Sequence, residues 1–218
     1  MEIPRWGRQG GTVLNFHYIF MSVVVSTKEA ILRRVAIFID GGYLDKLLRN
    51  EFDGIRINYE TFSREVIAQI HPDAHLLRTY YYHCLPYQSN PPTQEESERF
   101  SSMQSFLNSI NRLPRFEVKL GRLARRGPDE NGRYLFEQKM VDVLLSIDLV
   151  RLSARGQITD IALAAGDSDF VPAVEVAKNE GVSVWLYHGN RPHNALWDAA
   201  DERIKITQDI INKIRWQS

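Results

Sequence analysis

The chain has little cysteine, no excess of either charge and no apolar run long enough to cross a membrane. Cys84 is the single cysteine, which excludes an internal disulfide and a cysteine-based zinc site and is typical of a reducing cytoplasm. Lysine plus arginine and aspartate plus glutamate each number 27, so the chain is not a generally basic nucleic-acid-binding protein. Any such role requires a local basic patch. We expect a cytoplasmic protein that does not enter a membrane.

The composition predicts one domain preceded by an extension. The 218 residues are 44% apolar and 25% charged, which is ordinary for a globular domain, and they contain no internal repeat or low-complexity linker. The early apolar stretch 13–25 is interrupted by Asn15 and His17 and is shorter than a membrane span. We predict that residues 1–33 are an amino-terminal extension, either disordered or upstream of a native start such as Met21. Residues 34–218 are then the domain.

Strands and helices alternate along the predicted domain. Two apolar runs without polar alternation, 35–39 and 161–165, predict strands buried on both faces of a parallel sheet. Further strands are expected over 76–85 and 182–187, and a β-hairpin or a strand with a flap over 116–136. Helical spacing predicts helices over 59–70, about 94–111, 139–155 and 170–180. The sum is an α/β fold, a three-layer α/β/α sandwich with a mostly parallel sheet and a small hairpin insertion.

Aspartates follow both buried runs. Asp40 comes after the first run, beside Gly41 and Gly42, and Asp167 and Asp169 come after the second. Ligands of open α/β sheets bind beyond the carboxyl ends of the strands, where these carboxylates are expected to meet. The ordinary structural explanation is that each aspartate caps the following helix. Three carboxylates at one edge repel one another at neutral pH unless a cation lies between them, so we predict a divalent metal site.

The predicted helix 139–155 supplies a fourth carboxylate. Its apolar residues leave Asp142 on a narrow polar strip, which suits a carboxylate that lines a cleft. Asp148 lies about 120° further round and roughly 9 Å along the helix, so one ion does not reach both, and we assign Asp148 to a buried structural bond. A donor set made only of carboxylate oxygens favours Mg²⁺ or Mn²⁺. The apolar residues expected to be buried are Val141, Leu144, Leu145 and Leu152, together with Val143, Ile147 and Val150.

Three motifs together resemble a known family. Residues 38–44 read FIDGGYL, 139–148 read KMVDVLLSID and 166–170 read GDSDF. Over roughly 34–207 the chain resembles the NYN domain, most closely its LabA-like (DUF88) branch within the PIN-like nuclease superfamily. The resemblance implies a Rossmann-like fold and ribonuclease activity, with Mg²⁺ or Mn²⁺ held by Asp40, Asp142, Asp167 and Asp169. The family often has asparagine where this chain has Gly42, a departure that bears on substrate positioning rather than on metal binding.

The expected chemistry is metal-assisted hydrolysis of phosphodiester bonds in RNA. The expected partner is single-stranded RNA, with DNA and a homodimer left open. Lys139 has two interpretations of equal weight, a phosphate contact or a solvated lysine, and Ser168 either holds a metal-bound water or satisfies a backbone amide. A basic hairpin is expected to hold phosphates beside the metal. The candidate substrate-binding residues are Gly41, Gly42, Lys139, Ser168, Arg122, Arg125 and Arg126, within a basic segment that also holds Arg112, Arg115, Lys119 and Arg133.

Other polar residues have weaker claims. His188 and His193 are expected at the rim of the carboxylate site, because they follow the end of a predicted strand. Asn194 and Asp201 are interpreted either as structural residues, such as helix caps, or as residues that support the metal ligands without touching the metal. Among Tyr80, Tyr81 and Tyr82, at least one is expected in the core because alternate residues of a strand point in opposite directions.

Two other functions compete with the ribonuclease. One is an RNA-binding or regulatory protein that retains the fold without cutting. The other is a haloacid-dehalogenase-like phosphatase, which needs an acid/base aspartate where this chain has Gly42 and is therefore disfavoured.

Overall fold

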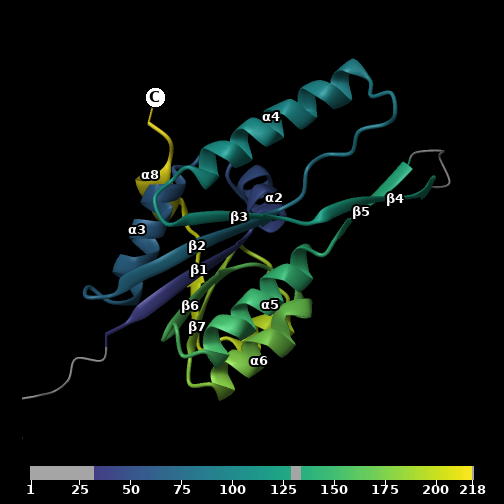
Figure 1. Ribbon diagram of the computed structural model, residues 1–218. Coiled ribbons are helices and arrows are strands. Elements are labelled where there is room, and N and C mark those ends of the chain that lie inside the picture. Colours follow the sequence, from purple (N-terminus) through teal and green to yellow (C-terminus); the bar gives the residue numbers. More distant parts are fainter. Residues whose placement is uncertain (1–31, 129–133, 218) are drawn as a thin grey trace, which may run out of the picture. The chain divides into compact units, whose positions relative to one another are not determined.

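A six-stranded, wholly parallel sheet lies at the centre of the part of the chain that the computed structural model describes, residues 32–128 and 134–217 (Figure 1). All of these residues belong to the unit that begins at Leu32. Successive residues of the two central strands are buried, so neither face of the sheet is open to water and the sequence shows no alternation there. The strand order is β3-β2-β1-β6-β7-β8, with β1 (Arg34–Asp40), β2 (His75–His83), β3 (Phe116–Leu120), β6 (Asp160–Ala164), β7 (Ser183–His188) and β8 (Glu202–Lys205).

Helices cover both faces of the sheet and complete the predicted three-layer sandwich. Val35, Ile37 and Ile39 of β1 face one apolar core, whereas Ala36 and Phe38 face the other. The first core is closed by α2 (Gly41–Glu51), α3 (Tyr59–Ile70), α4 (Gln94–Asn111) and α8 (Gln208–Ile214). The second is closed by α5 (Val141–Ala154), α6 (Val171–Asn179) and α7 (Asn194–Ala199). A short 3-10 turn, η1 (Ser168–Phe170), precedes α6.

The ends of several helices follow from local sequence signals. The helix predicted over 59–70 is α3, with the same limits. The start of α4 is a capping box, in which Thr93 Oγ1 accepts from the Glu96 N–H at 3.2 Å and a Glu96 carboxylate oxygen accepts from the Thr93 N–H at 3.0 Å. Gly156 and Gly181, which follow α5 and α6, have φ values of 59° and 80°, a backbone conformation that favours glycine.

Of the two arrangements predicted for 116–136, the structure has the strand with a flap rather than one hairpin, and it differs from the prediction at Lys139. Phe116–Leu120 is not part of a hairpin but joins the sheet edge, parallel to β2. The hairpin consists of β4 (Arg122–Pro128) and β5 (Tyr134–Lys139), which pair only with each other. Lys139 therefore ends a strand rather than opening a helix, because Met140 adopts a left-handed conformation with φ 74° and α5 begins after it.

The outer face of α5 also differs from the prediction. Val143 and Ile147 are each 55% exposed, because only one side of the helix packs against the sheet. Val141, Leu145, Leu149 and Leu152 form that buried side. The predicted extension, residues 1–33, lies outside the described residues except for its last two. Within 32–128 and 134–217, no helix combines the length and the apolarity needed to cross a bilayer.

Candidate functional site

The sheet topology brings three separate sequence motifs to one edge. The chain places β2 and β3 on one side of β1 and β6, β7 and β8 on the other, so the topological switch point lies between β1 and β6. Crevices at such points are where open α/β sheets bind ligands. Asp40 is the last residue of β1, Asp167 follows the end of β6, and Asp142 lies in the first turn of α5, the helix that links the two halves of the sheet.

The carboxylates at this edge perturb one another. Burial raises the pKa of Asp142 above its usual range, and the neighbouring charges of Asp167 and Asp169 raise it further. Burial also raises the pKa of Asp40, with a further increase from Asp142, while the N–H groups of Tyr43 and Gly42 oppose the change. Charges act in this way only at short range, so the four predicted carboxylates share one neighbourhood.

Helix capping accounts for only two of these four aspartates. Asp40 Oδ1 accepts a hydrogen bond from the Tyr43 N–H at 3.1 Å and caps α2. Asp167 Oδ1 accepts from the Asp169 N–H at 3.3 Å and caps η1, and the Ser168 hydroxyl lies 3.4 Å from the same oxygen. Asp142 and Asp169 cap nothing. The second pair therefore has no structural role of the kind that the capping explanation requires.

The chemistry of the donor set suits a hard divalent cation. Within the described residues, none of the four carboxylates forms an ion pair with lysine, arginine or histidine. In the same part of the chain, no group of three or more acidic, histidine or cysteine side chains is arranged to hold a metal ion. Carboxylate oxygens are the ligands that Mg²⁺ and Mn²⁺ prefer, but the described residues do not arrange the four carboxylates as a metal site.

Tyr43 connects the strand ends that carry Asp40 and Asp167. Its N–H is the donor to Asp40, and its hydroxyl accepts a hydrogen bond from the Gly189 N–H at 2.9 Å, beyond the end of β7. Its ring fills the space beside Gly166, where an added Cβ would lie only 2.2 Å from a ring carbon. Glycine at 166 is therefore needed for this contact, and one side chain fixes the separation of three strand ends.

A histidine–aspartate pair supports the other side of Asp40. His83 Nε2 lies 3.3 Å from Asp45 Oδ2, and a Cβ on Gly41 would lie 2.6 Å from the His83 ring. Burial lowers the pKa of His83, but the hydrogen bonds with Asp45 and Cys84 outweigh it and raise the pKa to about 10. The resulting imidazolium helps to keep the neighbouring Asp40 ionised. The start of α2 is packed directly on this pair.

Comparison with known proteins identifies the family. The model of the NYN domain matches residues 34–207. The chain belongs to the NYN domain family. This family is part of the PIN-like nuclease superfamily, and its membership confirms the predicted resemblance, whereas the LabA-like branch stays a prediction.

Other comparisons add little. No curated protein sequence gives a significant match. Among solved structures, MurG of Acinetobacter baumannii is similar over 81% of this chain and 42% of the MurG chain, with 12% identity and a TM-score of 0.38. The chain thus spans less than half the length of MurG, and the similarity is too weak to inform the function.

Asp148 of the NYN domain lies away from the carboxylate edge. It is 4% exposed and accepts hydrogen bonds from the Tyr82 hydroxyl at 2.9 Å and the Arg151 guanidinium at 2.8 Å, and Lys119 forms an ion pair with it. Lys119, one of the predicted basic residues, is thereby engaged in the fold rather than available to RNA.

The predicted basic residues of the hairpin are described only in part. Arg122 begins β4 and is exposed. The side chains of Arg125, Arg126 and Lys139 lie outside the described residues, so their proposed phosphate contacts stay predictions.

Two weaker assignments are revised. Asn194 does not cap α7, because it is the first helical residue and His193 is the cap, accepting from the Ala195 N–H at 3.3 Å. The Asp201 carboxylate accepts a hydrogen bond from the Val184 N–H at 2.8 Å and lies 3.0 Å from the Lys178 ammonium. These contacts are at the amino end of β7 and therefore at the opposite edge of the sheet.

Tyr80, Tyr81 and Tyr82 are all buried, so none is free to stack on a base.

The residues that sequence reasoning missed are Tyr43, Asp45 and His83. The position of His83 at the end of the strand beside β1 was a usable signal, because it places the ring at the same edge as Asp40. Tyr43 carried no such signal, since its contacts with Gly166 and Gly189 join residues more than a hundred positions apart.

Proposed function

We propose that this NYN domain is a metal-dependent ribonuclease that hydrolyses phosphodiester bonds of single-stranded RNA. The observation that carries the proposal is the gathering of Asp40, Asp142, Asp167 and Asp169 at the switch point, where burial and mutual repulsion raise the pKa values of Asp40 and Asp142. Membership of a nuclease superfamily that acts on RNA supports the same reaction.

The four aspartates would hold Mg²⁺ or Mn²⁺. When bound, such an ion supplies a water of lowered pKa and stabilises charge on the reacting phosphate. The protein contributes rigid placement of the carboxylates. Asp40 and Asp167 are oriented by the caps that they form, while Asp142 and Asp169 have no backbone partner among the described residues.

Of the two glycines that follow Asp40, we assign only Gly42 to contact with the RNA backbone. Gly41 is buried against His83 and Tyr81, so we do not assign it to the RNA. Gly42 lies in the first turn of α2, where backbone N–H groups and the positive end of the helix would favour a phosphate. Ser168 lies between two of the carboxylates along the chain. We assign it to substrate or water contact, and the hairpin arginines to phosphate contact.

The proposal is tested by cleavage of labelled single-stranded RNA in Mn²⁺, Mg²⁺ or EDTA, with the native protein and the variants Asp40→Asn and Asp167→Asn. We expect cutting that needs the ion and is lost in both variants. Asp73→Asn is the matched control, because Asp73 is exposed in the connection between α3 and β2, at the other edge of the sheet.

Binding of RNA by the native protein without cutting in any of the three conditions would contradict the enzyme and favour the non-catalytic RNA-binding alternative. Cutting of DNA at the same rate as RNA would correct the substrate class.

A further inference from the structure

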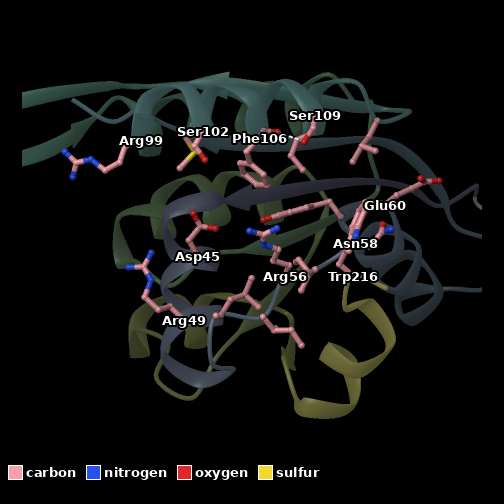
Figure 2. A pocket seen from close by; sticks show the side chains of 18 of the residues that line it. Asp45, Arg49, Arg56, Asn58, Glu60, Arg99, Ser102, Phe106, Ser109 and Trp216 are labelled. Atoms are coloured by element: carbon pink, nitrogen blue, oxygen red, sulfur yellow. Dashed lines mark hydrogen bonds between the residues drawn. The ribbon is translucent and has the colours of Figure 1, made fainter. Parts of the chain in front are cut away.

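A deep cavity lies on the face of the sheet opposite α5, away from the residues already discussed as metal ligands. It has a volume of about 1130 Å³, slightly above the usual range of about 300–1,000 Å³ for ligand pockets. Figure 2 shows it between α4, which carries Arg99 and Phe106, and the part of α2 that carries Asp45 and Arg49. We call it the α4 groove.

The α4 groove contains arginines that have no acidic partner among the residues that the structure describes, although its three arginines are matched in number by three acidic residues. Arg49, Arg56 and Arg99 line it, and in the described part of the chain Arg49 and Arg56 have no acidic partner, while Arg99 lies 3.9 Å from Glu95. Arg215 lines an adjoining cavity of about 520 Å³ that shares Arg56.

The acids of the groove offset these arginines only in part. Asp45 is paired with His83, which leaves Glu60 and Glu98 as the lining carboxylates without a cationic partner among the described residues. Over the α4 groove and the adjoining cavity together, three guanidinium groups without an acidic partner among the described residues, those of Arg49, Arg56 and Arg215, face these two carboxylates.

Flat apolar surfaces lie among these arginines. Trp216 is 62% exposed although it is one of the largest apolar side chains, and it lines both cavities. Phe106 packs edge-on against Tyr81, with ring centroids 6.0 Å apart, and its remaining surface faces the groove. Aromatic faces beside positive charge are how proteins hold single-stranded nucleic acid without regard to its sequence.

The α4 groove leads away from the carboxylate edge. One end is marked by Asp45, five residues after Asp40 on α2, which corresponds to about 7–8 Å along the helix axis. Pro86, which follows the end of β2, lines the same cavity. A strand held at Asp40 would thus lie near this end of the groove.

We propose that the α4 groove binds the part of a single-stranded RNA that flanks the bond to be cut. Phosphates would contact Arg49, Arg56 and Arg99, and a base would stack on Trp216. This inference rests on the proposed function, and it adds that affinity depends on the length of the RNA, because only a strand that reaches past the carboxylates fills the groove.

The test compares labelled RNAs of about four and about sixteen nucleotides, with binding measured by fluorescence anisotropy in EDTA so that nothing is cut. The variants are Trp216→Ala and the triple variant Arg49→Gln/Arg56→Gln/Arg99→Gln. Arg64→Gln is the control, because Arg64 is exposed on α3 and does not line the groove.

We expect Trp216→Ala to weaken binding of the longer RNA by roughly 5- to 150-fold. The slope of log K against log salt concentration should become shallower by about 2 in the triple variant, because each lost phosphate contact contributes about 0.7 to that slope. Neither variant should change the rate at which the shorter RNA is cut in Mn²⁺.

If these variants bind the longer RNA with native affinity and cut RNA at the native rate, the proposed role of the groove is wrong, whereas the proposed ribonuclease activity is supported. Loss of self-association or of a protein partner in place of RNA affinity would also overturn the role of the groove. Length-dependent binding without any cutting would support the groove and contradict the ribonuclease.

Discussion

Two aspartates six residues apart on α5 have opposite surroundings. Asp148, in the middle of the helix, is buried and meets a lysine, an arginine and a tyrosine hydroxyl. Asp142, in the first turn, meets Asp167 and Asp169, and its pKa is raised by burial and by those charges. The fold therefore gives Asp148 partners of opposite charge and places Asp142 among like charges.

The difference separates stability from function along a single helix. An acid with internal partners contributes to folding, whereas an acid placed among like charges costs stability until a cation binds. The following predictions test whether this contrast holds, beginning with the largest effect.

Asp142→Asn should lower metal-dependent RNA cleavage at least roughly 100-fold, because a bound ion contributes several kcal/mol to the reaction. The folded chain should be no less stable. Single-turnover cleavage in Mn²⁺ measures the first effect and thermal unfolding the second. Native activity in this variant would contradict the proposed role of Asp142 in cleavage.

The same variant has a signature that does not need catalysis. Since the pKa of Asp142 is raised above 3.8 in the folded protein, the folded state binds protons more tightly than the unfolded state. The stability of the metal-free protein thus falls as the pH rises through the folded pKa, and Asp142→Asn should reduce that fall. Mn²⁺ should raise the Tm of the native protein at neutral pH and have a smaller effect on the variant.

Asp148→Ala should leave the chemistry unchanged and lower the free energy of unfolding by about 2 kcal/mol, because it removes the acceptor of a buried tyrosine hydroxyl and of two cations. A chain of this size should then lose about 4–8 °C in Tm. Arg151→Gln is the control: its side chain is 45% exposed, so we expect a loss below about 1 kcal/mol. Lost cleavage at a temperature where Asp148→Ala is folded would place Asp148 in the site.

Tyr43→Phe sharpens the comparison because it changes the placement of the carboxylates without changing their charge. Removing the hydroxyl leaves the Gly189 N–H without its acceptor, at a cost of about 1 kcal/mol. Metal affinity should fall by roughly tenfold, as it does when groups that orient metal ligands are removed. Isothermal titration with Mn²⁺ measures the change, and unchanged affinity together with reduced stability would restrict Tyr43 to folding.

The His83–Asp45 pair predicts the smallest effect and a defined pH window. The pKa of His83 is raised from 6.5 to about 10, so the stability that this pair adds is present in full below pH 6.5 and is lost as the pH rises towards 10. Asp45 is 32% exposed, and we expect the contribution to be below about 1 kcal/mol. Thermal unfolding across this window should show a shallower slope for Asp45→Asn, and an unchanged slope would contradict the pairing.

The sequence was sufficient for the sheet and for the edge where the acids meet, because apolar runs that end in aspartate are local signals. It was insufficient to predict which face of α5 is buried, because helical spacing alone predicted burial of Val143 and Ile147. How much of a helix is covered depends on partners elsewhere in the chain. The pairing of β3 could not be predicted for the same reason, since its alternation suits a hairpin or a sheet edge equally well. The cap of α7 was also not predictable, because either Asn194 or its neighbour His193 could form it, and His193 does.

The backbone of Met140 links two parts of the proposed nuclease mechanically. A left-handed conformation costs a residue with a side chain about 1–2 kcal/mol, and here it joins the last residue of the hairpin to the turn that carries Asp142. Since Met140 is the only residue between β5 and α5, its backbone conformation sets the direction of the hairpin relative to the first turn of α5. In the proposed nuclease, RNA bound along the hairpin would therefore leave the hairpin beside the turn that carries Asp142.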